Sequence, residues 1–172
     1  MGRPSLPEEA LLFIGILYRD QAYLSSARES ISGRFGGILI ETAPMSWDYS
    51  RYYEEELGRP LKRVFTFFED RIDPETLAAI KITTNKIEAS LSIEGKRNIN
   101  LDPGYLTAAK VVLASTKNYS HRIYVGQGIF AEVTLVYREG GYRPHLFTYP
   151  DYASDAYAEI FARARQLLQK TS

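Results

Sequence analysis

Apolar residues along the first part of the chain come in short runs that polar turns separate. The run from Leu11 to Tyr18 is continuous, too short for a typical helix and bounded by charge, which predicts a buried central strand. Asp20 is suited to cap a following helix that runs to about Ile31. The stop and the next turn are supplied by Gly33, Gly36 and Gly37.

Two further strands are expected, at Ile38–Thr42 and at Leu61–Phe68, where β-branched and aromatic residues concentrate. Between them, Pro44–Pro60 is predicted to be a long connection with a short helix around Tyr52–Leu57. Asp73-Pro74 is a strong helix start, because Asp accepts from free backbone donors and Pro fits the first helical position. The helix that follows is amphipathic, with its apolar face at Leu77, Ile80, Thr84, Ile87 and Leu91.

The second half of the chain mixes strand and turn signals. Arg97–Leu101 alternates as a strand, and Pro103-Gly104 predicts a type II turn. Leu106–Ser115 fits either helix or strand, and helix is favoured because Leu106, Ala109 and Leu113 share a helical face. A hairpin of His121–Val125 with Ile129–Tyr137 is then expected, and a second turn at Gly140-Gly141 leads into a strand over Tyr142–Tyr149. A final helix is predicted to begin at Ser154 or Asp155. Its inward-facing residues are Tyr157, Ile160, Phe161, Ala164 and Leu168.

These elements predict an α+β fold with one domain over residues 1–172. The first six follow the ferredoxin-like βαββαβ order, extended by a helix, a β-meander and a C-terminal helix. Composition agrees with a globular domain, because 45% of the residues are apolar and 24% are charged. A chain of this length buries roughly 70% of its unfolded surface and needs no disulfide.

Charge and cysteine content narrow the function. Lys and Arg (21) balance Asp and Glu (21), so no global field favours nucleic acid or acidic membranes. Without cysteine, thiol nucleophiles and thiolate metal sites are excluded. The apolar run Leu11–Leu17 follows two glutamates and is too short to span a bilayer, so a cytoplasmic protein with no membrane partner is expected.

Candidate chemistry begins with two asparagines in a predicted strand that ends on Asp102. Asparagine is uncommon in strands, so the presence of Asn98 and Asn100 in this one requires an explanation. In one explanation, the two asparagines lie on an exposed face of the sheet and Asp102 caps the next helix. The other is a ligand site at the strand end, where Asp102 is a general base or cation ligand and Tyr105 a hydrogen-bond donor.

The hairpin gives a second set of candidates. If Gly126-Gln127-Gly128 is a three-residue loop, Arg122 lies opposite Glu132 and an ion pair follows. The pair either fixes the register of the sheet or orients Arg122 towards an anion. His121 should point to the other face, because neighbouring strand residues alternate, and is either structural or a proton-transfer residue.

Other polar residues are weaker candidates. Lys62 and Arg63 stand at the start of a strand, and Asp151 is either a turn residue or faces the ligand. An Mg²⁺ site from Asp102, Glu132 or Asp151 stays open, although no metal ligand set is predicted. A polar stripe on the second long helix is expected to be solvated surface: Lys81, Asn85 and Glu88.

Phosphate-loop, dinucleotide-binding, nucleophile-elbow and zinc-helix motifs do not occur. The RNA-recognition motif has the same element order, but Lys62–Glu69 lacks its glycine and places the aromatics out of phase, which argues against nucleic acid as a partner.

Four segments resemble a prokaryotic family, the domain-of-unknown-function family numbered 4416: Asn100–Leu106, His121–Tyr124, Ala131–Leu135 and Tyr149–Tyr152. Tyr52-Tyr53 and Thr84-Asn85 extend the likeness over nearly the whole chain. The resemblance implies one domain and no assigned activity.

The leading hypothesis is a site for a small anionic or phosphorylated ligand, such as a nucleotide, built from Asn100, Asp102, Tyr105, Arg122 and Glu132 with Lys62 and Arg63 nearby. The site could be enzymatic, with an unidentified reaction and an unknown cofactor. The alternative is a non-catalytic RNA- or protein-binding module that uses exposed aromatics: Trp47, Tyr49, Tyr52 and Tyr53.

Overall fold

The computed structural model describes residues 2–169, so the two ends of the expected domain, Met1 and residues 170–172, lie outside the described residues. The strands are β1 (Ala10–Tyr18), β2 (Ile38–Glu41), β3 (Met45–Trp47), β4 (Leu61–Ile72), β5 (Ile99–Leu106), β6 (Lys110–Ser115), β7 (Ile123–Gly126), β8 (Ile129–Arg138) and β9 (Gly141–Arg143). The helices are α1 (Gln21–Phe35), α2 (Glu54–Leu57), the 3₁₀ turn η1 (Pro74–Thr76), α3 (Leu77–Ser90) and α4 (Asp155–Gln169).

Strand β1 lies at the centre of the fold. All nine of its residues are buried, as the continuous apolar run predicts. It pairs with β4 on one side and with β5 on the other, both antiparallel. The wider sheet has the order β2-β4-β1-β5-β6-β8-β7, with β3 added on β4 and β9 on β8.

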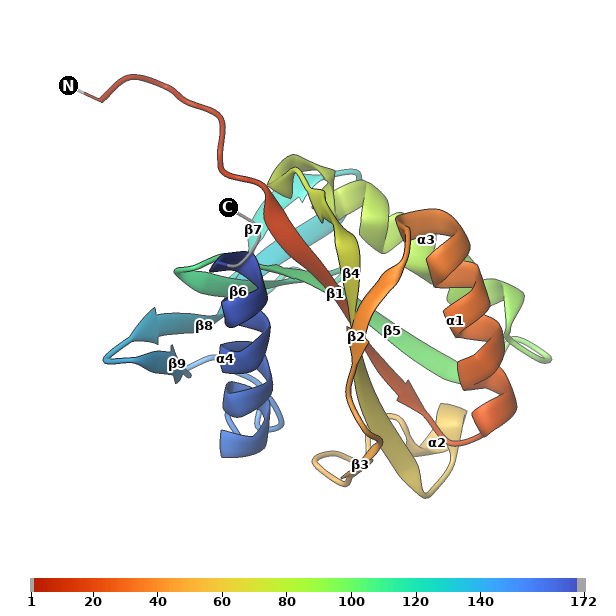
Figure 1. Cartoon of the computed structure of the whole chain (residues 1–172). Coiled ribbons are helices and arrows are strands. Elements are labelled where there is room, and N and C mark those ends of the chain that lie inside the picture. The colour runs from red at the N-terminus through yellow and green to blue at the C-terminus, as the bar shows by residue number, and fades with distance from the viewer. Residues whose placement is uncertain (1, 170–172) are drawn as a thin grey trace.

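The helices cover both faces of this sheet (Figure 1). On one face, Leu24, Ala27 and Ile31 of α1 and Ile80 and Ile87 of α3 pack on alternate residues of β1 and β4. On the other face, α4 packs its aromatic side chains on the remaining alternate residues. The α+β class is therefore as predicted, with helices on an antiparallel sheet. Among the described residues, no helix combines the length and the apolar character needed to cross a bilayer.

Capping signals predict the starts of two helices correctly. The side chain of Asp20 accepts a hydrogen bond from the backbone N–H of Ala22 at 2.8 Å. Asp73 likewise accepts from the N–H of Glu75 at 3.2 Å, and η1 then leads directly into α3. Both caps are formed with backbone groups two residues away in the sequence, so they do not depend on long-range packing.

The predicted βαββαβ order of the first elements is not reproduced. The connection Pro44–Pro60 contributes a strand, β3, which pairs with the start of β4, as well as the short helix α2. The helix expected over Leu106–Ser115 is also wrong, because this segment turns back and continues as β6. The expected last strand, Tyr142–Tyr149, is reduced to the three residues of β9.

The type II turn expected at Pro103-Gly104 is absent, because both residues lie inside β5. Gly104 is needed there for close approach: a Cβ atom would lie 2.4 Å from the carbonyl oxygen of Val112 and 2.6 Å from the ring of Phe13. Proline is tolerated where a strand has an unpaired edge, since it has no N–H to leave unsatisfied. Asp102 is therefore in the middle of a strand, and not at its end.

The hairpin loop is one residue shorter than expected. Gly126 pairs with Ile129, which leaves Gln127 and Gly128 as the loop. A bulge between Tyr124 and Gly126 compensates, so Tyr124 still pairs with Phe130. Because of the bulge, the two residues before Val125 pair with β8 in the predicted register and point to the predicted faces of the sheet.

Candidate functional site

A cavity of about 560 Å³ opens where the sheet forks between β5 and β6. The two strands pair only across Gly104–Leu106 and Val111–Leu113 among the described residues. Beyond this point they diverge, and the first half of β5 forms one wall of the cavity. One face of α3, the end of β6, the loop after it, the connection before α2 and the segment before α4 also line it.

Side chains of α3 satisfy the backbone of β5 at this fork. Lys81 Nζ donates to the carbonyl oxygen of Leu101 at 2.8 Å, and Glu88 Oε1 accepts from the N–H of Leu101 at 2.6 Å. Both side chains are buried. They therefore take the place of the missing neighbouring strand and hold the cavity floor in a fixed position.

A buried arginine joins two carboxylates beside this floor. Arg63, which is 2% exposed, donates from Nη1 to Asp102 Oδ2 at 3.1 Å and from Nη2 to Asp151 Oδ2 at 3.4 Å. Asp151 also accepts a hydrogen bond from Trp47 Nε1 at 3.0 Å. The guanidinium lies over Gly15, where a Cβ atom would be only 3.0 Å from Nη1. Pairing on both sides compensates the burial of the charge.

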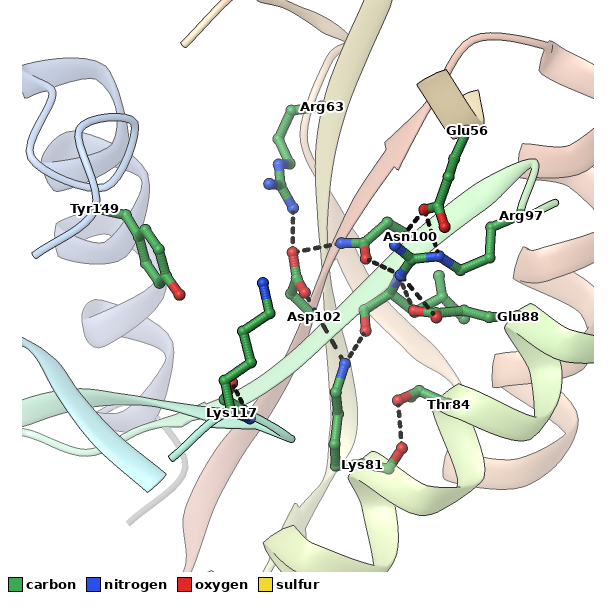
Figure 2. Close-up of polar contacts among 12 residues, drawn as sticks. Glu56, Arg63, Lys81, Thr84, Glu88, Arg97, Asn100, Asp102, Lys117 and Tyr149 are labelled. Carbon is green, nitrogen blue, oxygen red and sulfur yellow. Dashed lines mark hydrogen bonds and ion pairs between the residues drawn. The ribbon is translucent and has the colours of Figure 1, made fainter. Parts of the chain in front are cut away.

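Asp102 is the carboxylate that faces the cavity. Its Oδ2 accepts from Arg63 and, at 2.7 Å, from Asn100 Nδ2, whereas its Oδ1 lies 4.0 Å from Lys81 Nζ (Figure 2). Burial opposes ionisation, but Arg63 and Lys81 outweigh it and hold the pKa of the Asp102 carboxyl below its ordinary value. The group is therefore ionised at neutral pH and acts as a hydrogen-bond acceptor.

Arg97 extends this network towards α2. Its Nη1 donates to Asn100 Oδ1 at 3.0 Å and to Glu88 Oε2 at 3.4 Å, and its Nε donates to Glu56 at 2.9 Å (Figure 2). Burial raises the pKa of Glu88 above its ordinary value, against the opposing effect of Lys81. Each of these charged side chains thus has a partner of opposite sign.

The predicted ion pair of the hairpin is present on the other wall. Arg122 Nε donates to Glu132 Oε2 at 2.6 Å, and both residues are buried. Arg122 also donates to Ser115 Oγ at 2.8 Å, to the carbonyl oxygen of Lys117 at 3.0 Å and to the Tyr149 hydroxyl. With four hydrogen bonds donated, Arg122 mainly fixes the loop after β6 and the position of Tyr149.

His121 does not turn away from this pair as predicted. Its Nε2 lies 3.0 Å from Glu132 Oε2, and its ring stacks on Phe147 at 4.6 Å. The alternation rule fails because β7 begins only at Ile123, and the backbone at Arg122 is in a turn, with its N–H donating to Tyr119. His121 and Arg122 therefore reach the same carboxylate.

Six of the nine predicted site residues line this one cavity: Arg63, Asn100, Asp102, Arg122, Glu132 and Asp151. The other three lie elsewhere. Lys62 and Arg63 alternate along β4, so the Lys62 side chain is exposed on the other face. Tyr105 likewise faces away from Asp102 and packs with Leu77 and other residues of an apolar cluster. His121 lies behind Glu132, outside the lining.

The carboxylates do not converge on one point. Asp102 and Asp151 contact Arg63, whereas Glu132 contacts Arg122. Among residues 2–169, no three His, Asp or Glu side chains gather in a group that could hold a metal ion.

Five charged or amide side chains of the lining are not among the predicted site residues: Lys81, Asn85, Glu88, Arg97 and Lys117. The expectation that Lys81, Asn85 and Glu88 form a solvated stripe is wrong, because Lys81 and Glu88 are buried against the edge of β5. Their spacing of four and three residues does place them on one helix face. That face lies at the fork of the sheet, and the sequence carries no signal for the fork.

The aromatic residues of the connection before α2 divide into two kinds. Trp47 is 7% exposed and packs with Leu57 and Leu61, so its expected exposure is wrong. Tyr53 is half-buried, whereas Tyr49 and Tyr52 remain 43% and 60% exposed. All four rings line the cavity, and the indole–Asp151 hydrogen bond fixes this connection to the site.

Lys117 reaches the same space from the opposite wall. Its Nζ donates to the Tyr52 hydroxyl at 3.1 Å and lies 4.2 Å from the centre of that ring. In Figure 2, the Lys117 and Tyr149 side chains extend from their own wall towards Asp102. Lys117 is exposed, so it stands at the mouth of the cavity.

Comparison with known proteins identifies a family. No curated protein and no solved structure matches the chain. One family model matches residues 8–168, which include every strand and helix described above except the last residue of α4. The chain belongs to the family described as Domain of unknown function (DUF4416).

Proposed function

We propose that the cavity binds a small anionic or phosphorylated molecule, with Lys117 as the principal cation. Its volume of about 560 Å³ lies within the range of small-molecule sites. Its lining combines several tyrosine rings with nine charged side chains, and aromatic walls with fixed polar groups are typical of such sites.

The observation that carries the proposal is the pairing of the lining cations. Arg63, Arg97 and Arg122 each contact at least one carboxylate, and Lys81 lies 4.0 Å from Asp102. Over the described part of the chain, Lys117 has no carboxylate within 4.0 Å and contacts only a hydroxyl group and a ring face. An anion in the cavity would provide the charge partner that Lys117 lacks.

The surroundings support this role. Arg122 donates to the backbone carbonyl of Lys117 and to the Tyr149 hydroxyl, so one buried guanidinium positions both groups at the mouth. The Tyr149 hydroxyl accepts from Arg122 and keeps its own proton, because burial raises its pKa. Tyr149 can therefore donate a hydrogen bond to the same anion that Lys117 contacts.

The test is binding of inorganic phosphate and a panel of phosphorylated metabolites, measured by calorimetry and thermal shift, with native mass spectrometry of the purified protein to detect retained ligands. Replacing Lys117 by Met keeps the length of the side chain and removes its charge. K117M should weaken binding about tenfold, the equivalent of roughly 1.4 kcal/mol.

The matched control is K62M, because Lys62 is an exposed lysine outside the cavity. This variant should bind as the wild type does. Absence of binding by every compound, or equal loss in K117M and K62M, would refute the proposal.

The exposed rings of Tyr49 and Tyr52 favour a second candidate, a non-catalytic module that binds RNA or protein. In its nucleic-acid form, single-stranded RNA should bind more tightly as the salt concentration falls. Lack of binding to a single-stranded RNA at low salt would remove that form.

A further inference from the structure

We infer that the ligand of this cavity is a phosphate ester whose neutral body carries O–H or N–H groups, and that this body is recognised by Lys81, Asn85 and Asp102. These three residues are called the inner subsite below. The inference rests on the proposed function, in which Lys117 contacts the anionic group at the mouth.

Asp102 Oδ1 has unused capacity to accept hydrogen bonds. Its two side-chain donors, Arg63 and Asn100, both reach Oδ2, and Lys81 Nζ is too far from Oδ1 for a hydrogen bond. No other described residue donates to Oδ1, and the carboxylate is 24% exposed on the cavity side. A carboxylate oxygen can accept two hydrogen bonds, so Oδ1 is available to a ligand group that donates one.

Asn85 adds a second unused group. It lies one helical turn after Lys81 on α3, lines the cavity and is half-buried. Its amide makes no side-chain hydrogen bond with any of residues 2–169, although an amide can both donate and accept. A half-buried amide without a protein partner is suited to a ligand with polar groups of its own.

The charge of the inner subsite argues against a second anion. Lys81 donates one hydrogen bond to Leu101 and has two protons left, but its charge is offset by Asp102. An anion placed beside Asp102 would be repelled by its ionised carboxylate, because the charges of Arg63 and Lys81 are already balanced by Asp102 and Asp151. Neutral hydroxyl or N–H groups satisfy both the acceptor and the donors without that repulsion.

The arrangement of walls connects the two parts of the ligand. The inner subsite belongs to α3 and β5, whereas Lys117 and Tyr149 lie on the opposite wall (Figure 2). The cavity is far larger than a phosphate ion, so a phosphate held by Lys117 leaves room for a body that reaches Asp102. A sugar phosphate meets this description through its hydroxyl groups, and a nucleoside phosphate adds N–H groups and a planar base for the tyrosine rings.

The experiment compares five probes by calorimetry: inorganic phosphate, ribose 5-phosphate, adenosine 5′-monophosphate, ribose and adenosine. One of the two esters should bind the wild type at least about tenfold more tightly than inorganic phosphate. Ribose 5-phosphate as the tighter ester identifies a hydroxyl body, and the adenosine ester identifies a body with a planar base.

Two variants locate the effect. Asn85→Ala removes the amide and leaves no described group unpaired, and Asp102→Asn keeps the shape but replaces a carboxylate oxygen by a donor. Each should weaken the tighter ester about five- to tenfold and inorganic phosphate less than twofold. Because Asp102→Asn also weakens a buried ion pair, Asn85→Ala carries the test if Asp102→Asn does not fold.

The outcomes separate this inference from the proposed function. If inorganic phosphate and both esters bind equally, and all weaken in K117M, the inference is wrong and the proposed function stands. If ribose or adenosine binds with the same dependence on Asn85 while K117M has no effect, the inner subsite stands and the proposed anion site is wrong. If none of the five probes binds, both are overturned.

Discussion

Replacing Gly15 by Ala should destabilise the protein, because β1 has no room for a methyl group at this position. A Cβ atom would lie 3.0 Å from Arg63 Nη1, 3.1 Å from Tyr152 Oη and 3.1 Å from a ring carbon of Phe65. Each distance is a few tenths of an ångström too short. All three neighbours are at least 98% buried, so they cannot all move away.

The expected magnitude follows from two opposing effects. Overpacking a core costs about 1–3 kcal/mol, whereas Gly→Ala in a strand recovers roughly 0.5–1 kcal/mol of backbone entropy. The net loss in free energy of unfolding is therefore centred on about 1 kcal/mol, or roughly 2–4 °C in Tm for a chain of this size. The displaced Arg63 guanidinium should also move relative to Asp102, which links this position to the cavity.

Urea unfolding followed by the fluorescence of Trp47, the single tryptophan of the chain, measures the effect. Gly33→Ala is the matched control, since Gly33 lies in α1 and a Cβ atom added there would have no neighbouring atom within 4 Å. Gly33→Ala should stabilise by about 0.5–1 kcal/mol. Equal or greater stability of Gly15→Ala than of the wild type would refute the steric reasoning.

Three further outcomes are expected. Arg122→Met should lower the free energy of unfolding in urea by about 3–5 kcal/mol, because Glu132 is then buried without the Arg122 guanidinium as its partner. Adding Glu132→Gln to the same chain should restore part of this loss. A loss below about 1 kcal/mol would contradict a buried pair. The folded pKa of Asp102 lies below the unfolded value near 3.9, so the contribution of this carboxylate to stability is complete above about pH 4 and is lost as the pH falls through the folded pKa. Unfolding free energies measured from about pH 5 to pH 2 should therefore fall less steeply in Asp102→Asn than in the wild type. Equal slopes would argue against the lowered pKa. Trp47→Phe should lower stability by about 1–3 kcal/mol through the lost hydrogen bond to Asp151, measured by circular dichroism on heating, and an unchanged Tm would show that this bond contributes nothing.

Local signals in the sequence were sufficient for the elements that depend on neighbouring residues. The apolar run of β1 and the caps at Asp20 and Asp73 act over one to four residues, and the structure agrees with them. The Arg122–Glu132 pair was also predicted correctly, although the loop length used to derive it was wrong and a bulge restored the register.

The segment Pro103–Ser115 could not be predicted from local signals. Pro-Gly is typical of a turn, but here the proline lies on a strand edge and the glycine allows Phe13 and β6 to approach. The same long-range arrangement explains the missed residues of the site. Lys81 and Glu88 resemble ordinary surface residues until the edge of β5 lies beside them.

The short junction between β5 and β6 has a mechanical consequence. Backbone pairing across it covers Gly104–Leu106 and Val111–Leu113, yet the two cavity walls lie on opposite sides of it. Packing of α3 and α4 on the two faces of the sheet therefore contributes most to holding the walls together across this junction. A ligand that contacts both walls adds a further link, so amide hydrogen exchange at Tyr105 and Val112 should slow when the cavity is occupied, although neither residue lines it.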